Sequence, residues 1–75
     1  MKEKKFSQCI CLNGEFYNLQ AYKLFNLQDL LFYFCYKQNL IVLEYNGKIC
    51  TDNNWSLTRL KANDSIETIT IVGGG

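Results

Sequence analysis

The sequence predicts an α+β fold in which one helix packs on a mixed β-sheet. Three observations favour it: two Asn-Gly pairs that each separate strand-like segments, one stretch with the apolar spacing of a helix, and a last segment rich in isoleucine and threonine. The chain has 75 residues, and 48% of them are hydrophobic. This length suits one domain with a small core, built as a sheet layer and a helix layer.

Two hairpins are expected, one at each Asn-Gly pair. Asn13-Gly14 and Asn46-Gly47 are favoured in two-residue hairpin turns because both turn positions have positive φ. The strands joined by these turns are expected at residues 7–12 and 15–19, and at 41–45 and 48–50.

One helix of about ten residues is expected after Asn26, because apolar side chains recur there at the spacing of one helical face. The Asn26 side chain can cap the helix, and Asp29 in the first turn suits the helix dipole. Lys37 suits the other end of the dipole, and Asn39 is the expected stop. Cys35 is expected to be buried as a small hydrophobe. The apolar face comprises Leu27, Leu30, Leu31, Phe34 and Cys35.

The segment after the second hairpin is expected to be an irregular loop anchored by Trp55 and Leu57, with a turn at Asn63-Asp64. The last strand is expected at residues 65–72. The first and last strands would then lie side by side and parallel. This is the β-grasp arrangement found in ubiquitin.

Side chains alternate between the two faces of the last strand. Glu67, Ile69 and Ile71 share one face, and the other face comprises Ile66, Thr68, Thr70 and Val72.

Composition argues against several functions. The chain has no histidine, so the commonest general base and the commonest zinc ligand are both missing. The four cysteines include no Cys-x-x-Cys pair and are interpreted as free thiols. A net charge of +1, no apolar run long enough to cross a bilayer, and no signal-peptide pattern predict no nucleic acid and no membrane as partners.

The C-terminus is predicted to be a flexible tail of Gly73, Gly74 and Gly75 that follows a domain of residues 1–72. Glycine has no side chain to pack and is costly to order, so such a tail adds little to stability. It can, however, enter a narrow channel. If the tail is functional, its chemistry lies on the α-carboxylate of Gly75. The alternative is a frayed end without function.

Four segments point to a family when they are taken together. They are Ile-Cys-Leu-Asn-Gly-Glu at 10–15, Glu-Tyr-Asn-Gly-Lys-Ile at 44–49, Asp-Ser-Ile-Glu at 64–67 and Val-Gly-Gly-Gly at 72–75. Over nearly its whole length the chain resembles the ThiS family, the sulfur carrier proteins of thiamine thiazole biosynthesis. Departures from the family pattern fall mostly in loops, and Thr68 stands where isoleucine is typical.

The resemblance implies a non-enzymatic carrier. An E1-like adenylating enzyme of the ThiF type would use ATP to form an acyl adenylate on Gly75, and this chain would bind no cofactor. A protein persulfide would then supply sulfur, leaving a thiocarboxylate. The thiocarboxylate would donate its sulfur to a thiazole synthase of the ThiG type. Gly73 and Gly74 would let the tail reach these active sites.

An exposed apolar patch on a protein this small usually marks a partner site. Ile69, Ile71 and Val72 are therefore predicted to contact the activating enzyme, and Phe32, which lies off the helix's apolar stripe, is predicted to extend the same surface. The alternatives are that Ile66 and Val72 face outward instead, and that Phe32 is an isolated exposed aromatic residue.

Other functions share the same tail. A sulfur carrier of the molybdopterin synthase type would pass its sulfur to a different acceptor, and a ubiquitin-like modifier would join Gly75 to lysines. A purely structural β-grasp domain would make no use of the tail. The expected location is the cytoplasm, or the plastid stroma if the gene is organellar.

Overall fold

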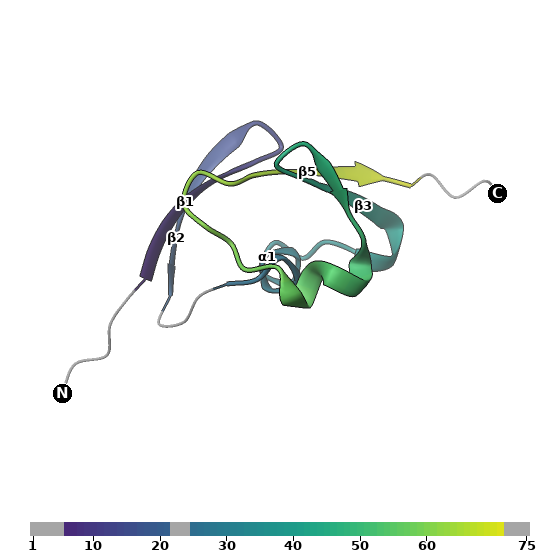
Figure 1. The fold of residues 1–75 in the computed structure, drawn as a ribbon, viewed down its shortest axis with the longest axis horizontal. Coiled ribbons are helices and arrows are strands. Elements are labelled where there is room, and N and C mark those ends of the chain that lie inside the picture. Colours follow the sequence, from purple (N-terminus) through teal and green to yellow (C-terminus); the bar gives the residue numbers. More distant parts are fainter. Residues whose placement is uncertain (1–5, 22–24, 72–75) are drawn as a thin grey trace.

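The computed structural model describes residues 6–21 and 25–71, and its elements follow the predicted order (Figure 1). In this part of the chain no helix is long and apolar enough to cross a membrane. The elements are β1 (Phe6–Leu12), β2 (Glu15–Ala21), α1 (Leu27–Tyr33), the short 3₁₀ helix η1 (Gln38–Leu40), β3 (Ile41–Tyr45), β4 (Lys48–Cys50), the 3₁₀ helix η2 (Asp52–Leu57) and β5 (Ser65–Thr70).

The strands form one mixed sheet in the order β2-β1-β5-β3-β4. β1 and β5 are parallel, and the other neighbouring pairs are antiparallel. The last strand therefore lies in the middle of the sheet, between the two hairpins, as predicted for a β-grasp fold. In Figure 1 the helix α1 lies on one side of this sheet, and the chain leaves β5 at the end marked C.

Both Asn-Gly pairs form the predicted turns. Asn13 and Gly14 have φ values of 52° and 82°, and Asn46 and Gly47 have values of 51° and 86°. Positive φ at both turn positions is the geometry of a type I′ turn, whose twist matches that of the two strands. The turns thereby set the register of both hairpins.

The core lies between α1 and the face of the sheet turned toward it. Apolar residues at alternate strand positions meet the apolar stripe of the helix there, and Trp55 of η2 closes one side. The buried apolar residues are Ile10, Leu12, Leu19, Leu27, Leu30, Leu31, Ile41, Leu43, Trp55, Leu60 and Ile66.

The helix begins as predicted but ends early. Asn26 accepts a hydrogen bond from the backbone N–H of Asp29, and the Asp29 side chain accepts one from the backbone of Asn26, which forms a capping box. However, α1 has seven residues, and the predictions that Lys37 lies in its last turn and that Asn39 stops it are wrong.

The early end comes from Cys35, whose φ of 61° takes the chain out of the helix. The N–H groups of Cys35 and Tyr36 donate to the carbonyl oxygens of Phe32 and Leu31 at 3.1 and 2.9 Å. These two bonds make a Schellman motif, in which the left-handed residue lies just past the helix. Cys35 is therefore exposed, and the prediction that it is buried is wrong.

The segment after β4 has more structure than the predicted irregular loop. Trp55 is buried, and its indole N–H donates to the carbonyl oxygen of Cys50 at 2.9 Å. Leu57 is 76% exposed, so the prediction that it anchors this segment is wrong. Trp55 alone therefore anchors η2 to the core, whereas both Trp55 and Leu57 were expected to do so.

Candidate functional site at the last strand

The predicted reactive end of the chain lies after β5. Val72, Gly73, Gly74 and Gly75 lie outside the described residues, and so does the predicted tail of residues 73–75. The structure describes the strand that leads to them, up to Ile71. The candidate site is therefore the surface around β5.

The start of β5 is held by Asp64, which is 4% exposed. Its carboxylate accepts hydrogen bonds from the Tyr45 hydroxyl, the Asn46 amide at 3.1 Å and the Lys61 backbone N–H at 2.7 Å. The Asn46 side-chain oxygen in turn accepts from the backbone N–H of Ser65 at 2.7 Å. Burial, together with the hydrogen bond to Asp64, raises the pKa of Tyr45 to about 12.

The middle of β5 is held by the other hairpin turn. The Asn13 side-chain oxygen accepts from the backbone N–H of Thr68 at 2.8 Å, and its amide donates to the Thr68 hydroxyl at 2.9 Å. The same amide donates to the Tyr36 hydroxyl at 3.0 Å. The two turn asparagines thus bind β5 at two points, which makes the strand a rigid base for the C-terminal end of the chain.

The sheet has one face that is turned away from α1. The part of this face that β3, β4 and β5 form is called the outer face. Ile69 and Ile71 lie on it and are 46% and 49% exposed, whereas Ile66 on the opposite face is fully buried. This confirms the predicted strand faces and rules out the alternative in which Ile66 faces outward. The outer face comprises Val42, Glu44, Ile49, Glu67, Ile69 and Ile71.

Phe32 is 80% exposed, as expected for a residue off the apolar stripe of α1. However, α1 packs against the face of the sheet that carries Ile66, opposite to Ile69 and Ile71. The structure therefore does not bring Phe32 together with the two isoleucines, and it does not extend their surface.

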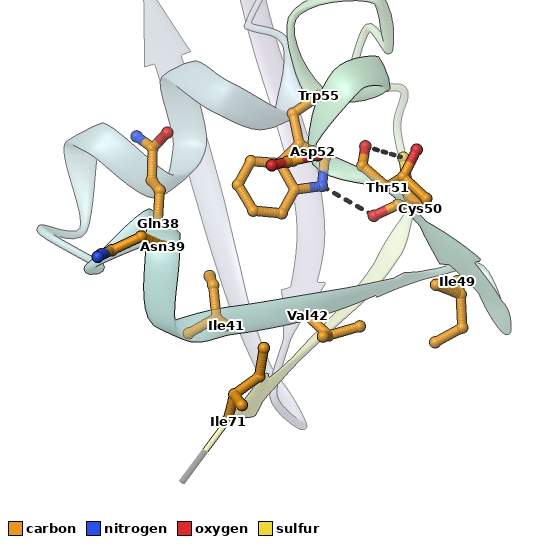
Figure 2. Close-up of a pocket in the computed structure, with 10 residues that line it drawn as sticks. All are labelled: Gln38, Asn39, Ile41, Val42, Ile49, Cys50, Thr51, Asp52, Trp55 and Ile71. Carbon is orange, nitrogen blue, oxygen red and sulfur yellow. Dashed lines mark hydrogen bonds between the residues drawn. The ribbon is translucent and has the colours of Figure 1, made fainter. Parts of the chain in front are cut away.

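A cavity of about 300 Å³ lies beside the outer face, between the start of β3, β4 and η2 (Figure 2). The Trp55 ring forms one wall, and Ile71, the last described residue, forms part of another. A cavity of this size is at the lower limit for small-molecule sites. The remaining lining residues are Gln38, Asn39, Ile41, Val42, Ile49, Cys50, Thr51 and Asp52.

Few side chains around β5 have the geometry for chemistry of their own. In residues 6–21 and 25–71 no three acidic or cysteine residues lie close enough to hold a metal ion. The four thiols are free, as predicted from the sequence. What the arrangement offers is a rigid strand with an exposed apolar face that leads into the chain's end.

Sequence reasoning missed Val42 and Ile49, which belong to the outer face, and Leu40, which borders it. Leu40 is 41% exposed, and its carbonyl oxygen accepts a hydrogen bond from the N–H of Ile71 at 2.7 Å. Val42 lies directly opposite Ile69, and Ile49 is 60% exposed. The alternation of Leu40 and Val42 around the buried Ile41 was the available signal, but it does not say which strand lies beside them.

Comparison of the structure with a solved structure identifies the fold. The crystal structure of the thiamine biosynthesis protein ThiS from Geobacter metallireducens matches with a TM-score of 0.78. The match covers 91% of this chain and 100% of the other, at 23% sequence identity. The protein thus has the ubiquitin-like β-grasp fold, with one helix on a mixed sheet.

Sequence comparison identifies the family. The model of the ThiS family matches residues 10–75, and the chain belongs to this family of small sulfur carriers. A relative described as "Uncharacterized protein ycf40" from Trieres chinensis is 49% identical over 65 residues, which is 85% of each chain. The family match begins within β1 and includes the last residue, Gly75, so it spans most of the described fold and the end of the chain.

Proposed function

We propose that this protein carries sulfur on the α-carboxylate of Gly75 for thiazole formation in thiamine biosynthesis. The observation that supports it best is the position of β5: the strand is held in the centre of the sheet, and the family match continues from it through the terminal glycines. The same proposal includes a location in the cytoplasm, or in the plastid stroma if the gene is organellar.

The chemistry needs little from this chain. A terminal carboxylate is ionised at neutral pH, because its usual pKa is about 3.3–3.7. It can attack the α-phosphate of ATP once a ThiF-type enzyme holds both, which releases pyrophosphate and forms the acyl adenylate. No general base is required on this chain, which agrees with its lack of histidine.

Sulfur then replaces AMP. The terminal sulfur of a protein persulfide attacks the activated carbonyl, AMP leaves, and a second thiol cleaves the sulfur–sulfur bond to free the thiocarboxylate. A ThiG-type synthase receives this sulfur. The chain acts throughout as a bound cosubstrate, and its partners supply the catalysis.

Reconstitution with ATP, the E1-like enzyme and a sulfur source tests the chemistry. Intact-mass spectrometry should show a gain of about 16 Da, the exchange of one oxygen for sulfur on a carrier. A chain that lacks Gly74 and Gly75 should fold normally and should not be adenylated. Adenylation of the truncated chain would contradict the proposal, and a ladder of protein conjugates would indicate a modifier instead.

Binding variants test the partner surface. Ile69→Asp should weaken binding to the activating enzyme, while Phe16→Asp, an equally drastic change at an exposed residue of β2, should not. Phe32→Asp tests the predicted contact at Phe32. Because α1 and the outer face lie on opposite sides of the sheet, a loss of binding at both Phe32 and Ile69 would require an enzyme that wraps around the domain.

A further inference from the structure

Two carboxylates oppose each other on the outer face. Glu44 of β3 and Glu67 of β5 are direct cross-strand partners. Partners on the same face of an antiparallel pair have Cβ atoms about 4.5–5.5 Å apart, and like charges placed in this way are destabilising. The pair is therefore unfavourable for the free domain, and a role in binding would account for it.

The pair has no counter-charge within the part of the chain that the structure describes. There, neither Glu44 nor Glu67 has an ion pair or a side-chain hydrogen bond. Lys48 is close in sequence, but it pairs with Tyr45, whose side chain packs against the core, and so it points to the other face. Among the described residues none supplies a counter-charge on the outer face, so the pair is open to a cation that a partner presents.

The surroundings of the pair are apolar. Glu44 has Glu67 of β5 as its neighbour on one side and Ile49 of β4 as its neighbour on the other, all on the same face of the sheet. Val42 and Ile69 form the next cross-strand pair toward the end of β5. Ile49 is 60% exposed and Ile69 is 46% exposed. A partner that covered these side chains would also exclude water from the carboxylates, which strengthens their attraction for a cation.

The charge of this face indicates what can cover it. A second copy of the chain, docked through the same face, would bring four carboxylates together, and nucleic acid would add phosphates to them. A guanidinium group suits the site better, because it is planar, weakly hydrated and able to bind two carboxylates through its fork of donors.

We propose that the enzyme that adenylates Gly75 presents an arginine to Glu44 and Glu67, with apolar side chains around it that cover Val42, Ile49 and Ile69. This inference rests on the proposed function, since it deepens the description of that enzyme's docking surface. The arginine would set the register of the enzyme on β5 and so direct the end of the chain into the active site.

The test compares Glu44→Gln/Glu67→Gln and Glu67→Lys with the wild-type chain in titrations against the activating enzyme. The dissociation constant should rise at least about tenfold for the double variant and further for Glu67→Lys, because a desolvated charge loses its partner. Its dependence on salt should weaken. Glu15→Gln removes one negative charge from β2, where Glu15 accepts a hydrogen bond from the Tyr17 hydroxyl, and is the control for loss of charge away from the outer face, with a change of less than about twofold.

The thermal stability of the free variants provides a second measurement, and it should increase while the affinity for the enzyme decreases. Removing the like-charge pair should raise the melting temperature of the free double variant by about 1–5 °C. A gain in stability together with a loss of binding supports docking at this pair. A folded double variant that binds the enzyme within twofold of wild type overturns it, and so does a loss of binding to the thiazole synthase alone.

Failure of this inference is separable from failure of the proposed function. If wild-type Gly75 is adenylated and the charge variants bind normally, the carrier function stands and the docking proposal is wrong. If wild-type Gly75 is not adenylated, the proposed function itself is wrong. Analytical ultracentrifugation tests the remaining alternative. If the wild-type chain sediments as a dimer and the Gln variants dimerise more tightly, the outer face binds a second copy of the chain and the proposal is wrong.

Discussion

Asn13 and Thr68, distant in sequence, are joined by two hydrogen bonds through a single side chain. The Asn13 oxygen accepts from the Thr68 backbone N–H, and its amide donates to the Thr68 hydroxyl. β1 pairs with β5 only as far as Leu12, where the turn begins. The Asn13 side chain thus continues the pairing beyond the end of β1.

This relationship predicts the effect of Asn13→Gly. Glycine keeps the turn, since it accepts the positive φ, but the two hydrogen bonds to Thr68 and the one to the Tyr36 hydroxyl are lost. The free energy of unfolding should fall by about 1–2 kcal/mol in urea titrations. Asn13→Asp, which keeps the acceptor for the Thr68 N–H, is the control and should lose less. Hydrogen exchange at the Thr68 amide should accelerate in Asn13→Gly; unchanged exchange would contradict the role of the side chain.

Cys35→Gly should stabilise the domain. The left-handed conformation that Cys35 adopts costs a residue with a Cβ about 1–2 kcal/mol, and glycine is free of this cost. Part of this gain is offset by the greater freedom of glycine in the unfolded chain, which leaves about 0.5–1 kcal/mol. Cys35→Ala keeps the Cβ and should change stability little. Denaturant unfolding of both variants checks this, and equal stabilities would refute the strain.

Tyr45→Phe should change both stability and its pH dependence. The variant deprives the buried Asp64 carboxylate of one donor, so it should lose about 1–2 kcal/mol near neutral pH. The folded pKa of Tyr45, about 12, is above its usual value of 10.0. Between these values the unfolded chain has released the proton and the folded chain still holds it. The stabilisation is therefore complete below about pH 10 and decreases as the pH rises toward 12.

The measurement is the difference in unfolding free energy between wild type and Tyr45→Phe as the pH rises. This difference should shrink above about pH 10, and lysine and cysteine titrations largely cancel because both chains contain them. A difference that stays constant up to pH 11 would show that the phenol is not held in its protonated form by the fold.

Two isoleucines of β5 should differ in their response to alanine. Ile66 is fully buried, so Ile66→Ala should cost about 2–5 kcal/mol through lost burial and a cavity. Ile69→Ala removes the same atoms from a half-exposed position and should cost less than about 1 kcal/mol. Thermal and urea unfolding of the two variants, run side by side, measure this contrast; similar losses would mean that the outer face is covered in the free protein.

The parts of the fold that depend on adjacent residues were predictable. Each Asn-Gly pair supplies the positive φ values of its own turn, and Asn26 with Asp29 caps its own helix. The alternation of side chains in β5 likewise put Ile66 and Ile69 on opposite faces, and the resemblance to the family, whose Asp-x-Ile segment turns its isoleucine inward, indicated that Ile66 is the buried one. These signals act over a few residues, where side chain and backbone are in direct contact.

Other features required the packed structure. The apolar stripe of α1 predicted burial at Cys35, but the chain left the helix at that residue because the Schellman hydrogen bonds compete with a further turn. The sequence also could not separate Phe32 from Ile69, which are both exposed but lie on opposite sides of the sheet.

Short-range chemistry in the chain accounts for the hairpin turns, the helix cap and the alternation of side chains along β5, because each is decided by neighbouring residues. Cross-strand register decided the rest, since the placing of Glu44 opposite Glu67 depends on how β3 and β5 align when the whole core closes. Residues that are far apart in the chain form a common surface only when the core packs, so the docking face exists only in the folded protein.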